Sequence, residues 1–327
     1  MSAEIPVGVE VWRGTTRESR HRVSVAVADA GGRLVLAIGD VRRPVYPRSA
    51  LKPIQALPLV ETGAADAFGL SDAELALACA SHGGEPMHVD RVRAWLARIG
   101  LDETALACGA HDPSYAPAAR VMIADHVEPT AAHNNCSGKH AGMLTTARHL
   151  GEPTAGYLAA DHPVQRRIKA TLEAFAETSV GEPGIDGCSV PTWPLPLADF
   201  ARAMARFGGE GAATTRIARA MRAHPELVAG TGRACTALMT HVPQLLAKTG
   251  AEGVYAACLL DHGLGIALKV EDGNGRADPV ALLAVIERLA PGAGAAPALA
   301  AFRRPVIRNV VGTEVGYVQP AEGWPPR

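Results

Sequence analysis

The stretch YPRSALKPIQ, residues 46–55, contains two residues that can do chemistry together, Ser49 and Lys52. The chain has 32 Lys and Arg residues, but only five of them are lysines. Arginine does not lose its proton in a protein, whereas a lysine that is buried or placed near other cations does. A lysine in a chain that otherwise uses arginine is therefore a candidate for proton transfer.

The spacing of Ser49 and Lys52 favours a serine activated by a lysine. Pro53 is tolerated only in the first turn of a helix, so we expect a helix to begin at Ser49. Residues three apart on a helix share a face. A serine hydroxyl needs a neighbouring base to become a nucleophile, and a desolvated lysine can supply one. The S-x-x-K pattern also occurs on solvated helix faces, so it is a weak signal by itself.

A second lysine stands in the triplet Lys248-Thr249-Gly250, just before an apolar, strand-like segment. An S-x-x-K box followed far downstream by K-T-G is the paired signature of penicillin-binding proteins and serine β-lactamases. We expect Lys248 to be catalytic and Thr249 and Gly250 to border the substrate. Taken alone, the triplet is typical of a surface turn.

The segment CASHGGE, residues 79–85, supplies a second serine, Ser81, directly after a predicted capped helix. In the penicillin-binding pattern a second serine relays a proton, and we expect Ser81 to do so with Lys248 as its partner. His82 and Glu85 are candidates for substrate contact. The alternative is a plain helix end with glycine caps.

The segment HNNCSGKHAGM, residues 133–143, places Cys136, Lys139 and His140 at helical spacing. The asparagines that precede them, Asn134 and Asn135, suit a polar substrate.

The segment DGCSVP, residues 186–191, adds Asp186 and Cys188. Two cysteines with a carboxylate and a histidine are ligands that zinc favours, although C-x-x-K is not a usual structural zinc box. The alternative is two buried thiols and a helix cap.

The order of predicted elements indicates an α+β fold. Strands are expected at 7–14, 21–29 and 33–40, and again at 253–260, 264–272 and 313–319 around a turn at 261–263. Helices are expected between them at 86–100, 136–151, 162–177, 197–209 and 214–224, with a closing helix at 278–290. We expect an antiparallel sheet formed from both chain ends, with flanking helices and an inserted helical region.

Composition restricts the function classes. A net charge of −1 and an aromatic content of 4% disfavour nucleic acid as a partner. No apolar run reaches the ~20 residues that span a bilayer, so a membrane is not expected as a partner. The N-terminal residues do not resemble a signal peptide, and six scattered cysteines suit a reducing compartment, so we expect a cytoplasmic protein.

Four segments together, PRSALKP, ASHGGE, NNCSGKHAGML and DGCSVP, resemble the Rhizobium-type L-asparaginases, the asparaginase II family. The resemblance runs from about residue 6 to past residue 320, over a single catalytic domain. It implies a β-lactamase and glutaminase-like fold, with an α/β part at about 1–60 and 240–327 and a helical part at about 61–239. It implies hydrolysis of L-asparagine to L-aspartate and ammonia, and suggests a homodimer.

The resemblance also implies roles for individual residues. Two Ser–Lys pairs map onto Ser49–Lys52 and Ser81–Lys248, and Lys269 on the next strand is the alternative second lysine. An ancillary zinc site maps onto Cys136, Lys139 and Cys188, with Asp186 close by, and no organic cofactor is expected. Arg48, His82, Asn134 and Asn135 are candidates for holding the charged α-groups of the substrate.

Three other readings remain open from the sequence. One is a glutaminase, and another is a penicillin-recognising serine hydrolase, against which the cysteine and asparagine string argues. The third is a non-catalytic zinc or small-amide binding protein on the same scaffold.

Overall fold

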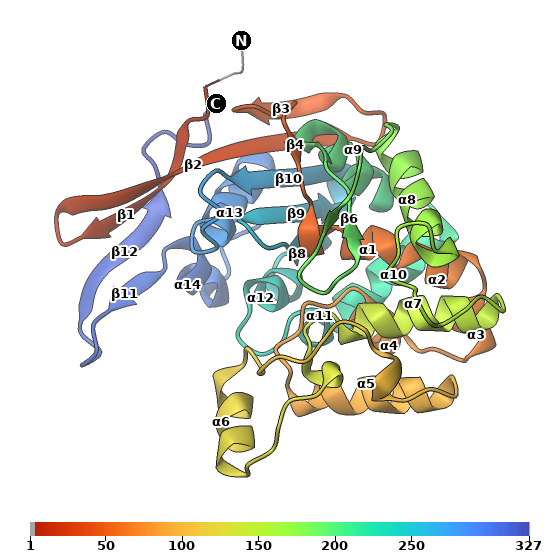
Figure 1. The fold of residues 1–327 in the computed structure, drawn as a ribbon. Coiled ribbons are helices and arrows are strands. Elements are labelled where there is room, and N and C mark those ends of the chain that lie inside the picture. The colour runs from red at the N-terminus through yellow and green to blue at the C-terminus, as the bar shows by residue number, and fades with distance from the viewer. Residues whose placement is uncertain (1–3, 327) are drawn as a thin grey trace. The chain divides into compact units, whose positions relative to one another are not determined.

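The computed structural model of the chain describes residues 4–326 and divides by its contacts into two units (Figure 1). Unit 1 comprises residues 4–50, 195–208 and 237–326 of the described chain. Unit 2 comprises residues 51–194 and 209–236. The first crossing between them lies between Ala50 and Leu51, inside the predicted S-x-x-K helix.

Unit 1 is built on an antiparallel sheet with the strand order β11-β12-β1-β2-β10-β9-β8, and β3 pairs with β2 outside this path. The sheet takes its strands from both ends of the chain, as Figure 1 shows in red and blue. Its strands are β1 (Val7–Arg13), β2 (Thr16–Asp29), β3 (Leu34–Ile38), β8 (Leu245–Thr249), β9 (Val254–Leu259), β10 (Leu264–Val270), β11 (Val306–Arg308) and β12 (Glu314–Pro320).

The central strands are apolar on both sides because helices pack against them. Residues 25–28 of β2 and all of β9 are buried. Helix α9 (Leu197–Phe207) packs on β2, β9 and β10, and α13 (Asp278–Leu289) contacts β9, β10, β1 and β12. Gly265 permits the close approach of α9, since a Cβ there would lie 2.1 Å from the carbonyl oxygen of Ala201.

Unit 2 is mainly helical. Several of its helices begin at a capping box or with a proline in the first turn. The helices that lie wholly in this unit are α1 (Lys52–Gln55), α2 (Leu57–Glu61), α3 (Ala64–Ala67), α4 (Asp72–Ala78), α5 (Pro86–Arg98), α6 (Ala116–Ala124), α7 (Ser137–His149), α8 (Pro163–Ala176), α10 (Ala212–Ala223) and α11 (Pro225–Val228). Helix α12 (Ala234–His241) begins in unit 2 and ends in unit 1.

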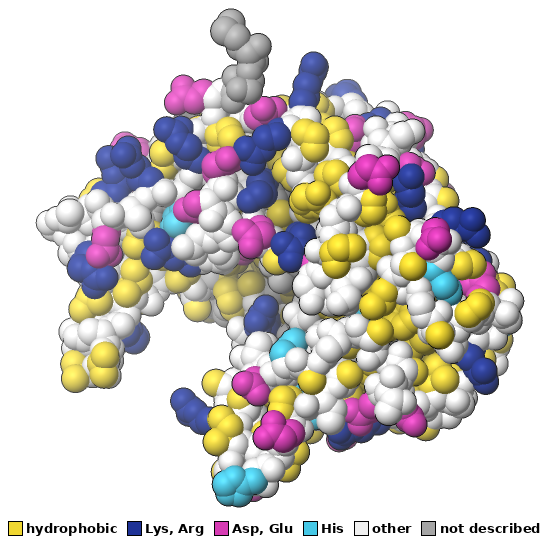
Figure 2. Space-filling model, in the orientation of Figure 1, with side chains coloured by type: hydrophobic (Ala, Val, Ile, Leu, Met, Phe, Trp, Pro, Cys, Tyr) yellow, Lys and Arg dark blue, Asp and Glu magenta, His cyan; other side chains and the backbone are white. Residues whose placement is uncertain are grey.

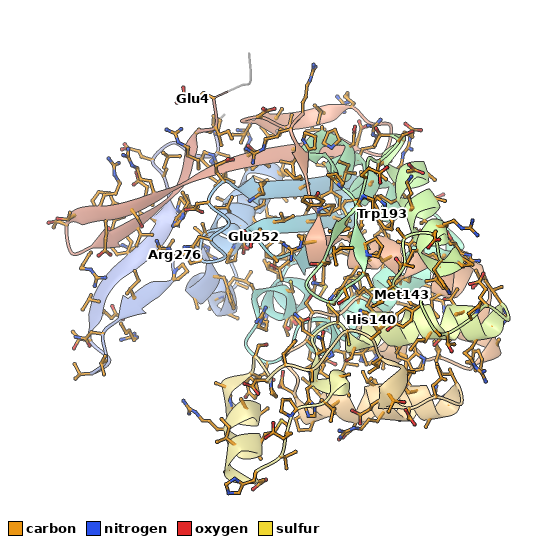
Figure 3. All side chains as sticks on the ribbon, in the orientation of Figure 1. Glu4, His140, Met143, Trp193, Glu252 and Arg276 are labelled. Carbon is orange, nitrogen blue, oxygen red and sulfur yellow. The ribbon has the colours of Figure 1, made fainter. Side chains whose placement is uncertain are left out.

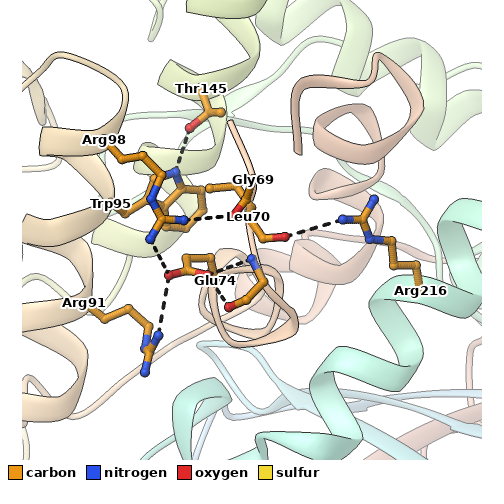
Figure 4. A network of polar contacts seen from close by, with 9 residues as sticks. Gly69, Leu70, Glu74, Arg91, Trp95, Arg98, Thr145 and Arg216 are labelled. Atoms are coloured by element: carbon orange, nitrogen blue, oxygen red, sulfur yellow. Dashed lines mark hydrogen bonds and ion pairs between the residues drawn. The ribbon is translucent and has the colours of Figure 1, made fainter. Parts of the chain in front are cut away.

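The buried carboxylate of Glu74 anchors α4, the helix that leads to Ser81. Glu74 forms the predicted capping box with Ser71 and lies 3.5 Å from both Arg91 and Arg98 of α5 (Figure 4). Arg98 also donates to the carbonyl of Gly69 at 3.1 Å. The network fixes the start of α4 against α5, and the chain leaves the other end of α4 towards Ser81.

The predicted fold class is confirmed: the protein is α+β, with an antiparallel sheet drawn from both chain ends. The turn at 261–263 is also present, as a short 3-10 helix closed by Gly263 at φ +61°. The sequence pattern does not predict β8, β11, α6 or α12. By their contacts, residues 51–60 group with the helical unit 2, and α9 groups with the sheet of unit 1.

The surface in Figure 2 carries basic and acidic side chains interspersed with each other. This mixture agrees with the net charge of −1. Within residues 4–326, no helix combines the length and the apolar character needed to cross a bilayer.

Candidate active site

Ser49 lies in unit 1, in a short 3-10 helix (Arg48–Leu51). Arg48 immediately before it has φ +52°, a left-handed conformation that a non-glycine residue seldom adopts. Strained backbone conformations are common at functional sites, and they persist only where the surrounding structure holds them in place. The predicted helix start is therefore a strained turn followed by helix.

The K-T-G triplet lies beside this turn within unit 1. A Cβ on Gly250 would lie 2.7 Å from the carbonyl oxygen of Pro47 and 3.2 Å from the amide nitrogen of Ala50. Only glycine allows the end of the edge strand β8 to come this close. Unit 1 thus brings the backbone on either side of Ser49 against the triplet of Lys248.

Lys248 is buried, with 1% of its surface exposed, and its Nζ donates to the carbonyl of Thr249 at 2.8 Å. Lys269, the alternative second lysine, is only half-buried on β10 and donates to the carbonyl of Glu252 at 2.7 Å. Burial lowers the pKa of Lys269. Lys248 stands on β8, two residues before Gly250, whose backbone approaches Pro47 and Ala50, and this placement favours Lys248 over Lys269 as the second lysine.

Lys52 is fully buried in unit 2 and its Nζ has three acceptors. They are the carbonyl of Ala80, the Oγ of Ser81 at 3.0 Å and the Sγ of Cys136 at 3.2 Å. Three acceptors match the three protons of a lysine ammonium group. Lys52 therefore connects the second predicted serine with a predicted metal ligand.

Cys136, Lys139 and Cys188 lie close together in unit 2. The Nζ of Lys139 lies 3.0 Å from the Sγ of Cys188, and the thiols of Cys136 and Cys188 share a hydrogen bond. Cys136 immediately precedes the first residue of α7, where the helix dipole favours negative charge. Lys139 lies one turn further along the same helix.

The electrostatics of this cluster suit one thiolate and one thiol. The hydrogen bond from Cys188 lowers the pKa of Cys136, and the ammonium groups of Lys52 and Lys139 lower it further against the opposing effect of burial. The same hydrogen bond and burial raise the pKa of Cys188. Burial lowers the pKa of Lys139, but the neighbouring sulfurs raise it by more.

The turn that carries Cys188 joins β5 (Gly184–Ile185) to β6 (Pro191–Thr192). Asp186 accepts from the amide of Gly187 through its side chain at 2.8 Å and from Ser189 through its carbonyl at 2.8 Å. Ser189 is left-handed, at φ +71°. This tight turn buries Cys188 while its neighbours Gly187 and Ser189 stay exposed.

His82 is buried against the start of α7 rather than displayed on a surface. Its Nδ1 accepts from the amide of Gly84 at 3.1 Å, so its Nε2 donates to the Oγ of Ser137 at 2.9 Å. The ring stacks on His88, with centroids 4.7 Å apart. Burial lowers the pKa of His82 well below its usual value. Through the contact with Ser137, the His82 side chain connects the segment that contains Ser81 to the first turn of α7.

Glu85 and Asn134 also hold segments of unit 2 together. Glu85 accepts from the amide of Thr231 at 2.9 Å and from its Oγ1 at 2.6 Å. Asn134 donates to the carbonyls of Cys108 and Gly109 at 2.9 and 3.0 Å and accepts from the amide of Cys136 at 2.8 Å. Their predicted substrate contacts stay predictions beside these observed structural roles.

Several residues of the site environment have no signal in the sequence. His111 accepts from the amide of Asn135 at 3.0 Å, and Tyr157 lies 2.6 Å from the Nδ1 of His140, which Figure 3 labels on α7. Tyr157 also accepts from the amide of Ala107 at 2.9 Å. Such partners come from segments tens of residues away, so no local pattern indicates them.

The predicted site residues thus fall into two groups. Unit 1 holds one beside the β8 end, and unit 2 holds the other around Lys52. The first group is Arg48, Ser49, Lys248, Thr249 and Gly250. The second group is Lys52, Ser81, His82, Glu85, Asn134, Asn135, Cys136, Lys139, Asp186 and Cys188. Within unit 2, Lys52 contacts Ser81, a Ser–Lys pairing that the sequence analysis did not propose.

The model of the family described as L-asparaginase II matches residues 9–320, nearly the whole chain. The chain belongs to the L-asparaginase II family. The match confirms the resemblance of its four segments to this family. No curated protein matches the sequence.

Solved structures match the fold at low sequence identity. The native form of Mglu matches with a TM-score of 0.50 and 15% identity, over 82% of this chain and 64% of that one. The chain therefore spans less than two thirds of the length of Mglu. A D-alanine carboxypeptidase AmpC from Burkholderia cenocepacia matches with a TM-score of 0.38 and 13% identity, over 77% of this chain and 88% of that one.

Proposed function

We propose that this amidohydrolase converts L-asparagine to L-aspartate and ammonia through a serine activated by Lys52. The observation that carries the proposal is the 3.0 Å contact between Lys52 Nζ and Ser81 Oγ in a buried setting. Both residues belong to motifs of the matched family region. Proximity of this kind between a hydroxyl and an amine is the geometry of a nucleophile and its base.

The chemistry proceeds in two halves. A serine oxygen attacks the side-chain amide carbon of asparagine while Lys52, in its neutral amine form, takes the hydroxyl proton. The C–N bond then breaks, the nitrogen leaves as ammonia with the proton that Lys52 took, and a β-aspartyl ester remains on the serine. Water attacks the ester, its hydroxyl group joins the released aspartate, and its other proton goes to the serine oxygen.

Ser49 is the nucleophile that the S-x-x-K motif favours, and Ser81 is the one that the observed Lys52 contact favours. In the first case Ser81 passes a proton to the leaving ammonia with Lys248 as its partner. In the second case Lys52 serves Ser81 directly. Backbone amides near Ser49 and after Lys248 would hold the developing oxyanion, a contribution of about 3 kcal/mol for each donor.

We also propose zinc as an ancillary metal at Cys136, Lys139 and Cys188, with Asp186 nearby. Two sulfurs and an amine nitrogen converge there, and this donor set fits the preference of zinc for sulfur and nitrogen. Within residues 4–326 no group of three or more His, Cys, Asp or Glu side chains is placed to hold a metal, so the proposed site takes the amine of Lys139 as its third donor. Bound zinc would orient the pocket while the serines supply the nucleophile.

Further residues and the oligomeric state complete the proposal. Arg48, Asn135, Thr249 and Gly250 are proposed to contact the α-groups or the reacting amide of the substrate. The protein is proposed to act as a cytoplasmic homodimer, which sedimentation analysis of the purified chain would test.

The test is ammonia release from L-asparagine, with L-glutamine as the competing substrate. We expect turnover of asparagine, and a fall of about 10²–10⁴-fold in Lys52→Ala and in the nucleophile's Ser→Ala variant. Two single variants serve as controls in the same unit and should keep full activity: Lys169→Ala, at a partly exposed lysine that lies near Glu173, and Ser179→Ala, at an exposed serine. Full turnover by Lys52→Ala, or release from glutamine alone, would overturn the proposal.

A further inference from the structure

The turn that follows the K-T-G triplet has a strained backbone. Residues 250–253 connect β8 to β9, and two of them in succession are left-handed, Glu252 at φ +59° and Gly253 at φ +64°. A left-handed glutamate persists only where the surrounding structure holds it in place. The turn also lies against the segment of Ser49, because a Cβ on Gly250 would meet the backbone on either side of that serine. The contacts that fix this turn therefore bear on the site.

Lys269 holds the turn from β10. Its Nζ donates to the carbonyl of Glu252 at 2.7 Å and to the carbonyl of Val270 at 2.5 Å, so one ammonium group links the turn to the end of β10. The amide of Val270 donates in addition to the carbonyl of Gly253 at 2.8 Å. We call these three hydrogen bonds the turn clamp. Through it, both left-handed residues have their carbonyls fixed to β10.

We propose that Lys269 is a positioning residue of the active site: it holds the Glu252 carbonyl so that the backbone amides after Lys248 stay aimed at the oxyanion of the reaction. This inference rests on the proposed function. It gives Lys269 a role that differs from that of a catalytic base.

The contacts of Lys269 are those of a hydrogen-bond donor. Both of its acceptors are backbone carbonyl oxygens, which have no proton to give. A general base must lie within hydrogen-bonding reach of the group whose proton it takes. Lys52 meets this condition, since its Nζ lies 3.0 Å from the hydroxyl of Ser81. The geometry of Lys269 suits holding a turn rather than moving a proton.

The turn clamp acts one residue away from a candidate oxyanion donor. The amide of Gly250 donates to the carbonyl of Val254 at 2.7 Å, so it is not available to an oxyanion. The amide of Ala251 has no hydrogen-bonding partner within residues 4–326, and Ala251 stands directly between Gly250 and the clamped Glu252. A displacement of about 1 Å in an active site costs up to about 10²-fold in rate. Loss of the clamp should therefore slow the reaction.

The first test is ammonia release from L-asparagine by variants of Lys269. Lys269→Met keeps the length of the side chain but removes the donors, so kcat should fall by about 10- to 100-fold. KM should change by less than about threefold, because the oxyanion exists in the transition state and not in the bound substrate. Lys269→Arg keeps charged donors and should retain at least about a third of the wild-type kcat.

The Arg variant separates the two roles, because arginine cannot act as a base. Lys269→Gln has a shorter, uncharged polar side chain, and its kcat should lie between those of the Met and Arg variants. It takes the place of Lys269→Met in the comparison if methionine prevents folding. Lys169→Met, at a partly exposed lysine of α8, is the matched control and should keep the wild-type kcat and KM.

The second test needs no substrate: amide hydrogen exchange of the peptide that covers residues 249–254, read by mass spectrometry. In Lys269→Met this peptide should exchange at least about tenfold faster than in the wild type, while the helices of unit 2 exchange as before. In Lys269→Arg and Lys169→Met it should exchange at nearly the wild-type rate.

Three results would overturn the proposal. They are an unchanged exchange rate of the turn in Lys269→Met, a wild-type kcat in a Lys269→Met protein whose turn has loosened, and a Lys269→Arg enzyme as slow as Lys269→Met although its turn stays protected. The last result would make Lys269 a base. A wild-type protein that releases no ammonia from any amide, but whose turn loosens in Lys269→Met, would refute the proposed function and support the turn clamp.

Discussion

The carboxylate of Glu85 accepts both the amide proton and the hydroxyl proton of Thr231, at 2.9 and 2.6 Å. Glu85 immediately precedes α5, and Thr231 follows a left-handed Gly230 at φ +110°. The approach is tight, since a Cβ on Gly230 would lie 2.5 Å from Glu85 Oε1. A buried carboxylate thus fixes the 228–231 turn, whose Val228 carbonyl in turn accepts from the amide of Ser81 at 2.9 Å.

Thr231→Val should lower the free energy of unfolding by about 1.5–3 kcal/mol, because a hydrogen bond to a buried charge is lost. Urea unfolding measures the change. Thr215→Val, at an exposed position of α10, is the matched control and should change stability by less than about 0.5 kcal/mol. Equal effects of the two substitutions would show that the Glu85 contact contributes nothing.

Two glycines of α7 should respond to alanine to very different degrees. A Cβ on Gly138 would lie 2.2 Å from the carbonyl oxygen of Leu77 on α4, whereas one on Gly142 meets its nearest atom at 3.4 Å, on the flexible side chain of Leu59. Gly138→Ala should destabilise by about 3 kcal/mol or more, and Gly142→Ala should change stability by no more than about 1 kcal/mol.

Thermal unfolding of the two variants checks this difference, and zinc uptake gives a second readout. Gly138→Ala separates α7, which carries Lys139, from α4, so it should also weaken metal binding. A Gly138→Ala protein as stable as Gly142→Ala would contradict the close packing of these helices.

The buried imidazoles of His82 and His88 predict an acid-sensitive fold. Burial lowers the pKa of both below the usual value of about 6.5. Below that pH the unfolded chain binds protons that the folded chain does not, so stability is full above about pH 6.5 and is lost as the pH falls. The slope is up to about 1.4 kcal/mol per pH unit for each histidine.

Urea unfolding at a series of pH values between about 7.5 and 5.5 measures this slope. His88→Gln removes one titrating group, so its stability should depend less steeply on pH than that of the wild type. An unchanged slope in His88→Gln would contradict the burial argument for this residue.

The sequence predicted the fold where residue periodicity is strong. Valine-rich strands at both ends and proline-started helices between them are local signals, and both are present. The edge strand β8 was not predicted, because its residues Leu245–Thr249 are too few to show a period and resemble a turn at Lys248. The exposed helix α6 has no buried face, so it lacks the pattern that amphipathic helices show.

In the candidate site, too, the sequence indicates the individual residues but not the contacts between them. Lysine and cysteine are scarce in this chain, and the motifs around Lys52 and Cys136 indicate from the sequence alone that both residues belong to a site. Their partners depend on tertiary packing: the contact between Lys52 and Ser81 joins positions 29 residues apart, which no motif spacing indicates. Motif spacing cannot show that Glu85 and Asn134 already have partners, because Thr231 and Gly109 lie in other segments.

Loss of the Asn134 contacts should affect the site more than the fold. Asn134→Ala removes two donors to the 108–109 segment and the acceptor for the amide of Cys136. We expect a loss of about 1–3 kcal/mol in stability and a weaker metal affinity, because Cys136 is no longer held. Calorimetric zinc titration measures the second effect; unchanged affinity would show that Asn134 does not position Cys136.

The most direct measurement is mass analysis of the enzyme quenched during turnover of L-asparagine. The account predicts an adduct with the mass of an aspartyl group on the peptide that contains Ser49 or on the one that contains Ser81. The adduct should be absent from Lys52→Ala and present in Lys169→Ala. A Lys52→Ala enzyme that releases ammonia at the wild-type rate, with no serine adduct in either protein, would contradict the central claim that Lys52 activates a serine nucleophile.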